Sequence, residues 1–339
     1  MRYASTAMKR ILVCRIGAFG DVCMTVPVVH SLSAQFEVHW LIRQGHDAIL
    51  GLFPEVKCQP VVLSHGEPHQ IPAGLVSQLA AAQYDALLDF SNWRIVARLA
   101  GQLKSIPVRA IAYDSTRRLV LQRLKNSLPW FVPFNKIVRI DGNVHRVFKW
   151  QQLVRAALGS SLSIHWPLRP IRLPGQSIRV LVHPHASRPE KCWPMDNLVA
   201  VLARLAEQMA IHCTINEGRG GERSAAQELG LRLRQAGLEV ALVPFDPSFI
   251  SLKKALEQMD FALGPDSGPL HFASLIGVPT VVIYGPHSPT EVAPLWRTVA
   301  VTPPGGRGST RDISPAMVLD GISRLFSLLF DRSDVGVRL

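Results

Sequence analysis

The sequence predicts an α/β protein with two doubly wound parallel sheets that face a cleft. Short apolar segments alternate with segments of helical periodicity in both halves of the chain. Strands that are apolar throughout are expected where helices cover both faces of a parallel sheet. Between the halves, residues 166–177 are rich in proline and lack periodicity, which indicates a linker. We therefore predict one domain at residues 1–165, a second at 178–313 and a final helix at 314–330.

Length and composition fit this division. A chain of 339 residues is long enough for two domains with a sizeable core each. Hydrophobic residues make up 47% and charged residues 18%, which excludes a disordered protein. The net charge of +12 favours anionic partners, and residues 94–149 alone hold twelve Lys and Arg against two Asp and Glu. Such a segment suits nucleic acid, an anionic lipid surface or a phosphorylated substrate, or it is only a solvated face.

The cysteines and the N-terminus predict a cytoplasmic protein. The five cysteines are scattered and form no CxxC pair, which argues against a disulfide framework or a structural zinc. The N-terminus begins basic and then turns apolar, but Arg15 and Asp21 interrupt the apolar run, so we expect no signal peptide. We find no run of about 18 uncharged apolar residues that would span a membrane, and peripheral attachment stays open.

The first half opens with a strand at 10–15, the glycine turn IGAFGD, a helix at 22–34 and a strand at 37–42. Gly17 and Gly20 would let the backbone approach another group closely. The turn does not match GxGxxG, no acid ends the second strand, and no GK[ST] follows a glycine-rich stretch, so neither a dinucleotide fingerprint nor a P-loop is supported. The further elements predicted in this half are at residues 60–63, 86–89, 94–103, 108–112 and 145–158.

Asp21 stands at the opening of the first helix, at the carboxyl end of the first strand. It can be a helix N-cap, which contributes about 1 kcal/mol. It can also be a carboxylate held over the cleft that takes a proton from a hydroxyl group. The second interpretation requires that the side chain face open space.

Three polar clusters follow strands of the second half, and the ends of parallel strands are where ligands bind. A cation, an acid and an open helix N-terminus at these ends suit a nucleotide diphosphate. No two carboxylates share a helix face with a histidine, so we expect no metal site. The clusters are HPHASRPEKCWP (183–194), NEGRGGERS (216–224) and PDSGPLH (265–271).

Each of these residues also has a purely structural interpretation. Lys191 can be a surface residue with a buried stem, and Glu222 can be an acid favoured by the dipole in the first turn of a helix. Asp266 can be a helix cap, and His271 can be a core residue.

Three motifs in this chain resemble those of glycosyltransferase family 9, the ADP-heptose:lipopolysaccharide heptosyltransferases. ILVCRIGAFGDVCMTVPVVHSL is similar to the N-terminal motif of the family, and HPHASRPEKCWP to its HPGAS…K.WP segment. GPDSGPLHFASLIGVPTVVIYGP is similar to its DTGxxHlAaAlG.PtvalfG segment. The motifs occur in the family order, although His185 replaces the usual glycine and Ser267 the commoner threonine.

The resemblance implies a GT-B fold of two Rossmann-like domains, with the donor nucleotide bound by the second and the acceptor by the first. It implies an inverting, metal-independent transfer of a heptose from ADP-heptose to a hydroxyl of the lipopolysaccharide inner core, with Asp21 as general base. The final helix would pack back on the first domain. By motif position the donor contacts would be Ser187, Lys191, Glu222 (with Glu217 as an alternative), Asp266, Ser267, Gly268 and His271.

For partners, the resemblance implies an anionic lipid A–core acceptor at the inner face of the inner membrane, without nucleic acid, protein partner or cofactor. Arg94, Arg117 and Arg118 would bind this acceptor, and Gly17 and Gly20 would lie in a loop near donor and acceptor. The alternatives are a GT-B transferase that uses another nucleotide sugar or acceptor, and a non-catalytic nucleotide-binding protein. A nucleotide-dependent oxidoreductase is disfavoured, because the GxGxxG fingerprint is missing.

Overall fold

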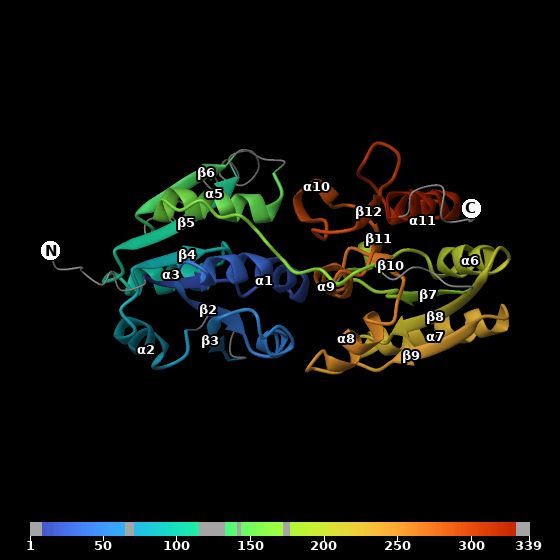
Figure 1. Cartoon of the computed structure of the whole chain (residues 1–339), viewed down its shortest axis with the longest axis horizontal. Helices are drawn as coiled ribbons and strands as arrows, with labels where there is room; N and C mark the ends of the chain where they lie inside the picture. The colour runs from blue at the N-terminus through green and yellow to red at the C-terminus, as the bar shows by residue number, and fades with distance from the viewer. Residues whose placement is uncertain (1–8, 65–70, 115–132, 141–143, 172–176, 330–339) are drawn as a thin grey trace. The chain divides into compact units, whose positions relative to one another are not determined.

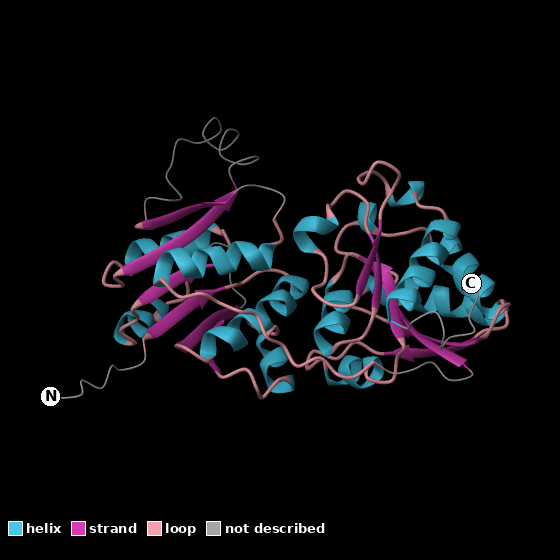
Figure 2. Cartoon of the chain, turned by 45° about the horizontal axis from the view of Figure 1, so that its top comes forward, coloured by secondary structure: helices cyan, strands magenta, loops and turns pink. Residues whose placement is uncertain are grey.

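The computed structural model describes residues 9–64, 71–114, 133–140, 144–171 and 177–329. The chain divides into two compact units, Met1–Trp166 and Pro167–Leu339. Each unit is built around one six-stranded parallel sheet with helices on both faces (Figures 1 and 2). The predicted α/β class with two doubly wound sheets is therefore confirmed.

The first unit alternates strands and helices from its beginning. Its elements are β1 (Arg10–Cys14), α1 (Phe19–Ser33), β2 (Glu37–Arg43), η1 (Asp47–Leu52), β3 (Cys58–Leu63), α2 (Leu75–Ala81), β4 (Ala86–Asp89), α3 (Arg94–Gln102), β5 (Val108–Asp114), β6 (Lys136–Ile140) and α5 (Arg146–Leu158). Helix α1 begins earlier than predicted, so that Ala18 is its N-cap and Asp21 lies within the first turn. The interpretation of Asp21 as the N-cap is therefore wrong.

The strands of the first sheet lie in the order β3-β2-β1-β4-β5-β6. The order reverses between β1 and β4, which pair in parallel from Ile11↔Ala86 to Cys14↔Asp89. Helices α2 and α3 contribute to the core on one face, while α1 and α5 pack together and against strands on the other. At such a reversal the loops after the two strands diverge and leave a crevice for a ligand.

The second unit repeats the plan. Its elements are β7 (Ser177–Val182), η2 (Pro189–Lys191), α6 (Met195–Ala206), β8 (Ala210–Asn216), α7 (Gly221–Gln235), β9 (Glu239–Val243), α8 (Ile250–Leu256), β10 (Phe261–Pro265), α9 (Gly268–Ile276), β11 (Thr280–Ile283), α10 (Pro289–Val292), β12 (Thr298–Val301), η3 (Thr310–Asp312) and α11 (Pro315–Leu329). The strand order is β12-β11-β10-β7-β8-β9. Counted within its unit this is again 3-2-1-4-5-6, with the reversal between β7 and β10.

Helix α11 packs on β11, β12 and α6 of the second unit. The expectation that the final helix also packs on the first domain stays a prediction. Val318, Ile322, Leu325 and Phe326 form one stripe of the helix and are buried in the core of the second unit, where the Phe326 ring meets Phe261 edge-on at 5.7 Å between centroids.

The predicted linker begins where the two units meet in the sequence. The Trp166 ring contacts His30 and Phe53 of the first unit, with centroids 5.5 and 5.3 Å away. Three residues later, Arg169 donates hydrogen bonds to the backbone oxygens of Glu257 and Met259 in the second unit. The residues on either side of the boundary are therefore each attached to their own unit.

Candidate functional site

The first turn of α1, which follows β1 at the reversal point of the first sheet, carries the Asp21 side chain. Arg15 Nη2 lies 2.6 Å from Asp21 Oδ2, and Arg146 Nη1 pairs with Asp21 Oδ1. The Asp21 side chain keeps 19% of its surface exposed, so the carboxylate is accessible at the surface of its own unit. Gly17 is required beside it, because a Cβ at that position would lie 2.7 Å from Asp21 Oδ2.

Arg15, which pairs with the Asp21 carboxylate, is buried and held in place by further contacts. Its side chain is only 5% exposed, it donates to the backbone oxygen of Phe90 after β4, and its guanidinium carbon lies 5.3 Å from the centre of the Trp150 ring. Burial lowers the pKa of Arg15, and the charge of Asp21 opposes that change. The contacts to Phe90 and Trp150 hold the guanidinium group in one place.

Asp89 ends β4 and is a second, fully buried acid near Arg15. Its Oδ1 accepts hydrogen bonds from the amides of Ser91 and Asn92 at 2.8 and 3.0 Å. Its Oδ2 is buried, with no hydrogen-bond partner among the described residues. Burial raises the pKa of Asp89 to about 7, because the two amide bonds and the charge of Arg15 offset only part of the desolvation.

In the second unit, Lys191 and Asp266 form a pair at the reversal point between β7 and β10. Lys191 Nζ lies 2.6 Å from Asp266 Oδ2 and donates to the Asp266 backbone oxygen at 3.0 Å. The two side chains are 12% and 10% exposed. The loop after β7 and the turn after β10 are thereby joined, as the sequence predicted from their position at neighbouring strand ends.

Two histidines complete this cluster. His271 Nε2 lies 3.4 Å from Asp266 Oδ1, and His287 Nδ1 lies 3.6 Å from Asp266 Oδ2. Arg188 Nη2 is 2.8 Å from His287 Nε2. Burial raises the pKa of Asp266, but the contacts with both histidines and the charges of His271 and Lys191 outweigh it and hold that pKa well below its usual range. Asp266 is therefore an ionised carboxylate that gathers cationic and donor groups.

Several buried polar atoms in and near this turn have no hydrogen-bond partner in the described part of the chain: Ser267 Oγ, His271 Nδ1 and the Tyr284 hydroxyl. Buried polar groups in proteins are nearly always paired, and an orphan costs about 1–3 kcal/mol. Ser267 is also the N-cap of α9, yet its side chain makes no capping bond. The turn is therefore suited to a polar ligand that supplies the missing hydrogen bonds.

The cluster at 216–224 contacts the cluster at 183–194. Asn216 Nδ2 lies 3.2 Å from His183 Nδ1, and Glu222 acts electrostatically on His185. Glu222 lies in the first turn of α7 and its Oε2 accepts from the Arg219 amide at 2.8 Å. Glu217 is buried, with Gln227 Nε2 3.4 Å from its Oε1. Glu222 is the more exposed of the two acids. The assignment of Glu222 rather than Glu217 as the ribose contact stays a prediction.

The histidine that replaces the usual glycine, His185, is buried next to a second histidine. Its ring centroid lies 5.6 Å from that of His183. Burial lowers the pKa of His185 and, to about 3, the pKa of His183, so both rings are neutral near pH 7. His185 Nε2 has no hydrogen-bond partner among the described residues.

The other predicted residues are placed as follows. Ser187 is exposed in the loop before η2, and Gly268 is the first residue of α9. Gly20 is buried in the first turn of α1, and Arg94 begins α3. Arg117 and Arg118 lie outside the described residues. Within the described ranges, no group of three or more His, Cys, Asp or Glu is arranged to hold a metal ion.

The sequence model of glycosyltransferase family 9 (heptosyltransferase) matches residues 73–304, more than two thirds of the chain. The chain belongs to glycosyltransferase family 9. It is thus a glycosyl-transfer enzyme, as the motifs predicted.

Named relatives agree with this membership. The chain is 25% identical over 310 residues to the lipopolysaccharide core heptosyltransferase OpsX of Haemophilus influenzae, covering 85% of this chain and 82% of that protein. It is 24% identical over 305 residues to lipopolysaccharide heptosyltransferase 1 of Pseudomonas aeruginosa, covering 83% and 79%.

Solved structures of this family have the same GT-B fold. The E. coli heptosyltransferase WaaC with ADP matches with a TM-score of 0.69 at 18% identity, over 93% of this chain and 99% of that one. The E. coli ADP-heptose lps heptosyltransferase II matches with a TM-score of 0.69 at 19% identity, over 95% and 99%. At these identities the likeness establishes the fold.

Sequence reasoning missed three side chains of the family 9 chain that the structure places at these clusters. Arg15 was noted only as an interruption of an apolar run, and Arg146 comes from a helix 125 positions after Asp21. His287 follows β11, so the rule that ligands bind at strand ends could have identified it. For Arg146 there was no local signal.

In the described part of this chain, no helix is both long and apolar enough to cross a membrane.

Proposed function

We propose that this family 9 enzyme transfers a heptose from ADP-heptose to a hydroxyl of the lipopolysaccharide inner core, with inversion at the anomeric carbon. The relatives that carry this proposal are named for that activity, and one solved neighbour is described as a complex with ADP. The observation that supports it most is the Lys191–Asp266 pair, beside which buried polar atoms lack partners. A diphosphate would supply acceptors to Ser267 Oγ and to the first amides of α9.

The reaction is a single displacement. The acceptor oxygen attacks the anomeric carbon as the bond from that carbon to the diphosphate oxygen breaks, and Asp21 takes the hydroxyl proton. The leaving ADP is stabilised by Lys191 and by the amide dipoles at the start of α9, so the charge that develops on it is met by protein groups without a metal ion. Ser187 and His271 are proposed as further diphosphate contacts, and Glu222 as the ribose contact.

An assay of the purified full chain tests this. We expect transfer of heptose from ADP-heptose to heptose-deficient lipopolysaccharide, with an inverted anomeric configuration by NMR and no loss of rate in EDTA. Asp21→Asn should lower kcat by ~10²–10⁴-fold, the usual contribution of a general base, while ADP affinity stays unchanged. Asp196→Asn is the matched control, because that carboxylate is exposed on α6 in a surface pair with Arg232. Near-normal turnover of Asp21→Asn would remove Asp21 from the base role.

The second candidate is a GT-B transferase with another nucleotide sugar. The observation in its favour is His185, a buried histidine where the family motif usually has glycine. Thermal shifts with ADP, UDP and GDP separate the two, since a ligand at ~100 times its Kd stabilises by ~2.7 kcal/mol. Stabilisation by ADP above the other two nucleotides is expected. A preference for UDP or GDP would favour the second candidate.

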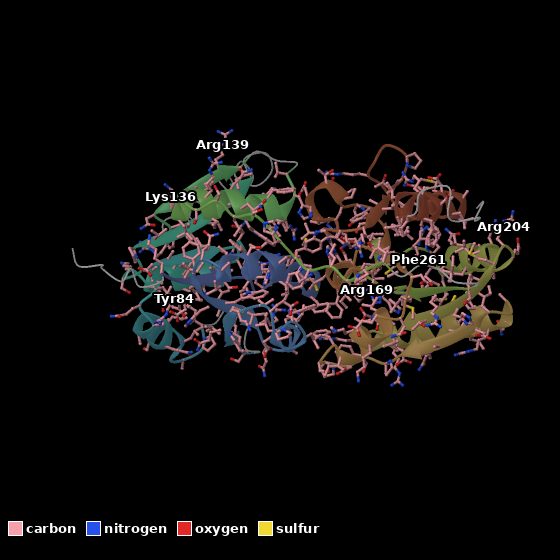
Figure 3. The ribbon with its side chains drawn as sticks, viewed as in Figure 1. Tyr84, Lys136, Arg139, Arg169, Arg204 and Phe261 are labelled. Atoms are coloured by element: carbon pink, nitrogen blue, oxygen red, sulfur yellow. The ribbon has the colours of Figure 1, made fainter. Side chains whose placement is uncertain are left out.

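For the acceptor, we propose an anionic lipid A–core molecule that meets the basic surface of the first unit at the inner face of the inner membrane. Lys136 and Arg139 support this, because both project from the edge strand β6 (Figure 3). Exposed charges are screened beyond about 8 Å at physiological salt. Raising the salt concentration should therefore raise the KM for the acceptor more than that for the donor, and equal sensitivity would contradict an electrostatic acceptor site.

A further inference from the structure

The two arginines that pair with Asp21 differ in kind. Arg15 is buried and is held by the Phe90 backbone oxygen and the Trp150 ring. Arg146 is the first residue of α5, and its side chain is 40% exposed. It pairs with Asp21 Oδ1, whereas Arg15 lies against Oδ2. One cation is therefore buried and held by the fold, and the other is an exposed side chain at the surface of its unit.

This arrangement is unfavourable for a general base. A nearby positive charge favours the ionised form of a carboxylate and opposes its protonation, and two such charges oppose it more. A base must also lie within hydrogen-bond reach of the proton that it takes. Because Arg146 occupies Oδ1, an acceptor hydroxyl would have to compete with a guanidinium group for that oxygen.

We propose that Arg146 is an acceptor-binding residue that exchanges partners on binding: it pairs with Asp21 in the free enzyme and with an oxyanion of the acceptor in the complex. The exchange takes Arg146 away from Oδ1, so that the acceptor hydroxyl can approach this oxygen, and it removes one cation from the base. The oxyanion is a carboxylate or phosphate group of the acceptor, since the planar guanidinium fork binds either in two-point fashion. This inference rests on the proposed function, because it assigns the acceptor side of the same reaction.

The surroundings of Asp21 single out Arg146 for this role. From the loop after β1, Arg15 faces the carboxylate, and its contacts fix it in place. From α1, Cys23 lies near, but burial raises the pKa of this thiol well above its usual range, so the thiol is neutral. From β4, the charge of Asp89 acts on Arg15. Arg146 of α5 is the exposed cation of this group.

The alternative is a purely structural role for Arg146. Helices α1 and α5 pack together, and the ion pair of Arg146 with Asp21 would stabilise this packing. That role predicts lower thermal stability on substitution, without a specific change in acceptor kinetics. The two roles are therefore separable by comparing the KM for each substrate with the melting temperature.

The test uses Arg146→Gln, Arg146→Lys and the control Arg155→Gln, an exposed arginine in the last turn of the same helix. In Arg146→Gln we expect the KM for the acceptor to rise ~10–100-fold, the usual range for a charged hydrogen bond, and the KM for ADP-heptose to stay within about twofold. The acidic limb of kcat/KM against pH should move to higher pH, because the ionised carboxylate of the free enzyme loses the stabilisation of one cation and its pKa rises. Arg146→Lys should keep the limb in place, and Arg155→Gln should behave as wild type.

A modified acceptor identifies the oxyanion. Methyl esterification of its carboxylates and enzymatic removal of its phosphates are compared in wild type and Arg146→Gln. The modification that removes the partner of Arg146 should raise the wild-type KM and leave the KM of the variant unchanged, as interacting groups do in a double-mutant cycle. If neither modification behaves in this way, or if Arg146→Gln keeps the acceptor KM and the pH limb and loses only thermal stability, the exchange is overturned. Absence of any heptose transfer by wild type would instead overturn the proposed function, and the exchange with it.

Discussion

Lys191 Nζ makes two contacts with one residue, the side chain of Asp266 at 2.6 Å and its backbone oxygen at 3.0 Å. A carboxylate at a site proposed for a diphosphate is at first sight unfavourable, because like charges repel. Here the carboxylate faces Lys191, His271 and His287, so it holds donors in place that a phosphate can then share. Asp266 thus acts on the ligand through the groups that it positions.

Replacing Lys191 tests this arrangement. In Lys191→Met we expect the Kd for ADP to rise ~10–100-fold, since a charged hydrogen bond is worth ~1.5–3 kcal/mol, while Lys191→Arg keeps part of the affinity. Isothermal titration calorimetry measures both. Lys253→Met is the control, because Lys253 of α8 pairs with Glu257, the C-cap of that helix. ADP affinity within twofold of wild type in Lys191→Met would mean that Lys191 only joins the two loops.

Removing the unpaired hydroxyl of Ser267 should affect the affinity for ADP without lowering the stability of the fold. Ser267 Oγ is buried without a partner, so Ser267→Ala should leave the melting temperature unchanged or raise it, yet weaken ADP binding by ~3–10-fold, the worth of one neutral hydrogen bond. Ser274→Ala is the opposite case, because Ser274 Oγ bonds both the oxygen and the amide of Trp296. That variant should lose stability and keep its ADP affinity. Unchanged ADP binding in Ser267→Ala would exclude the hydroxyl as a ligand group.

The sequence predicted the parts of the fold that depend on local pattern. Strands β1 to β5 and the helices at 94–103 and 145–158 were expected within a few residues of where they occur, because apolar runs and helical spacing are local signals. β6 was missed, because its five residues KIVRI include two charged residues. Charged side chains are common on edge strands, which are exposed to water.

In the candidate site, too, the sequence predicted the residues that follow a local pattern and missed those that depend on tertiary packing. Lys191 and Asp266 were expected together because both follow strands that end at one edge of the sheet. The pairing of Asp21 with Arg146 depends on how α5 packs beside α1 across 125 positions of sequence. No periodicity or motif carries such a contact, so only the tertiary structure could add Arg146 to the site.

Gly264 predicts a stability effect that follows from the close approach of two strands. A Cβ at this position in β10 would overlap the backbone oxygen of His183, which cannot move without breaking the pairing of β7 with β10. Gly264→Ala should therefore destabilise the second unit by at least about 2 kcal/mol, as overpacking does. Gly221→Ala, whose Cβ would meet nothing within 4 Å, should be neutral or stabilising. Urea unfolding of both variants measures the difference, and equal stabilities would contradict the overlap.

Asp89 predicts how the stability of the first unit depends on pH. Its pKa is about 7 in the folded protein against an ordinary value of 3.8, so between these values the folded state binds the proton that the unfolded state has released. The stability that this residue contributes is therefore complete below about pH 3.8 and is lost as the pH rises through about 7. In Asp89→Asn that part of the pH dependence should vanish, so the stability of wild type should fall relative to the variant by a few kcal/mol at most between pH 4.5 and 8. Hydrogen exchange of the β4 amides reports this unit by itself, with Asp196→Asn as the surface control. A carboxyl ¹³C titration of Asp89 with a midpoint near 4 would contradict the prediction, because the buried carboxylate would then be stabilised by a charge that the described residues do not supply.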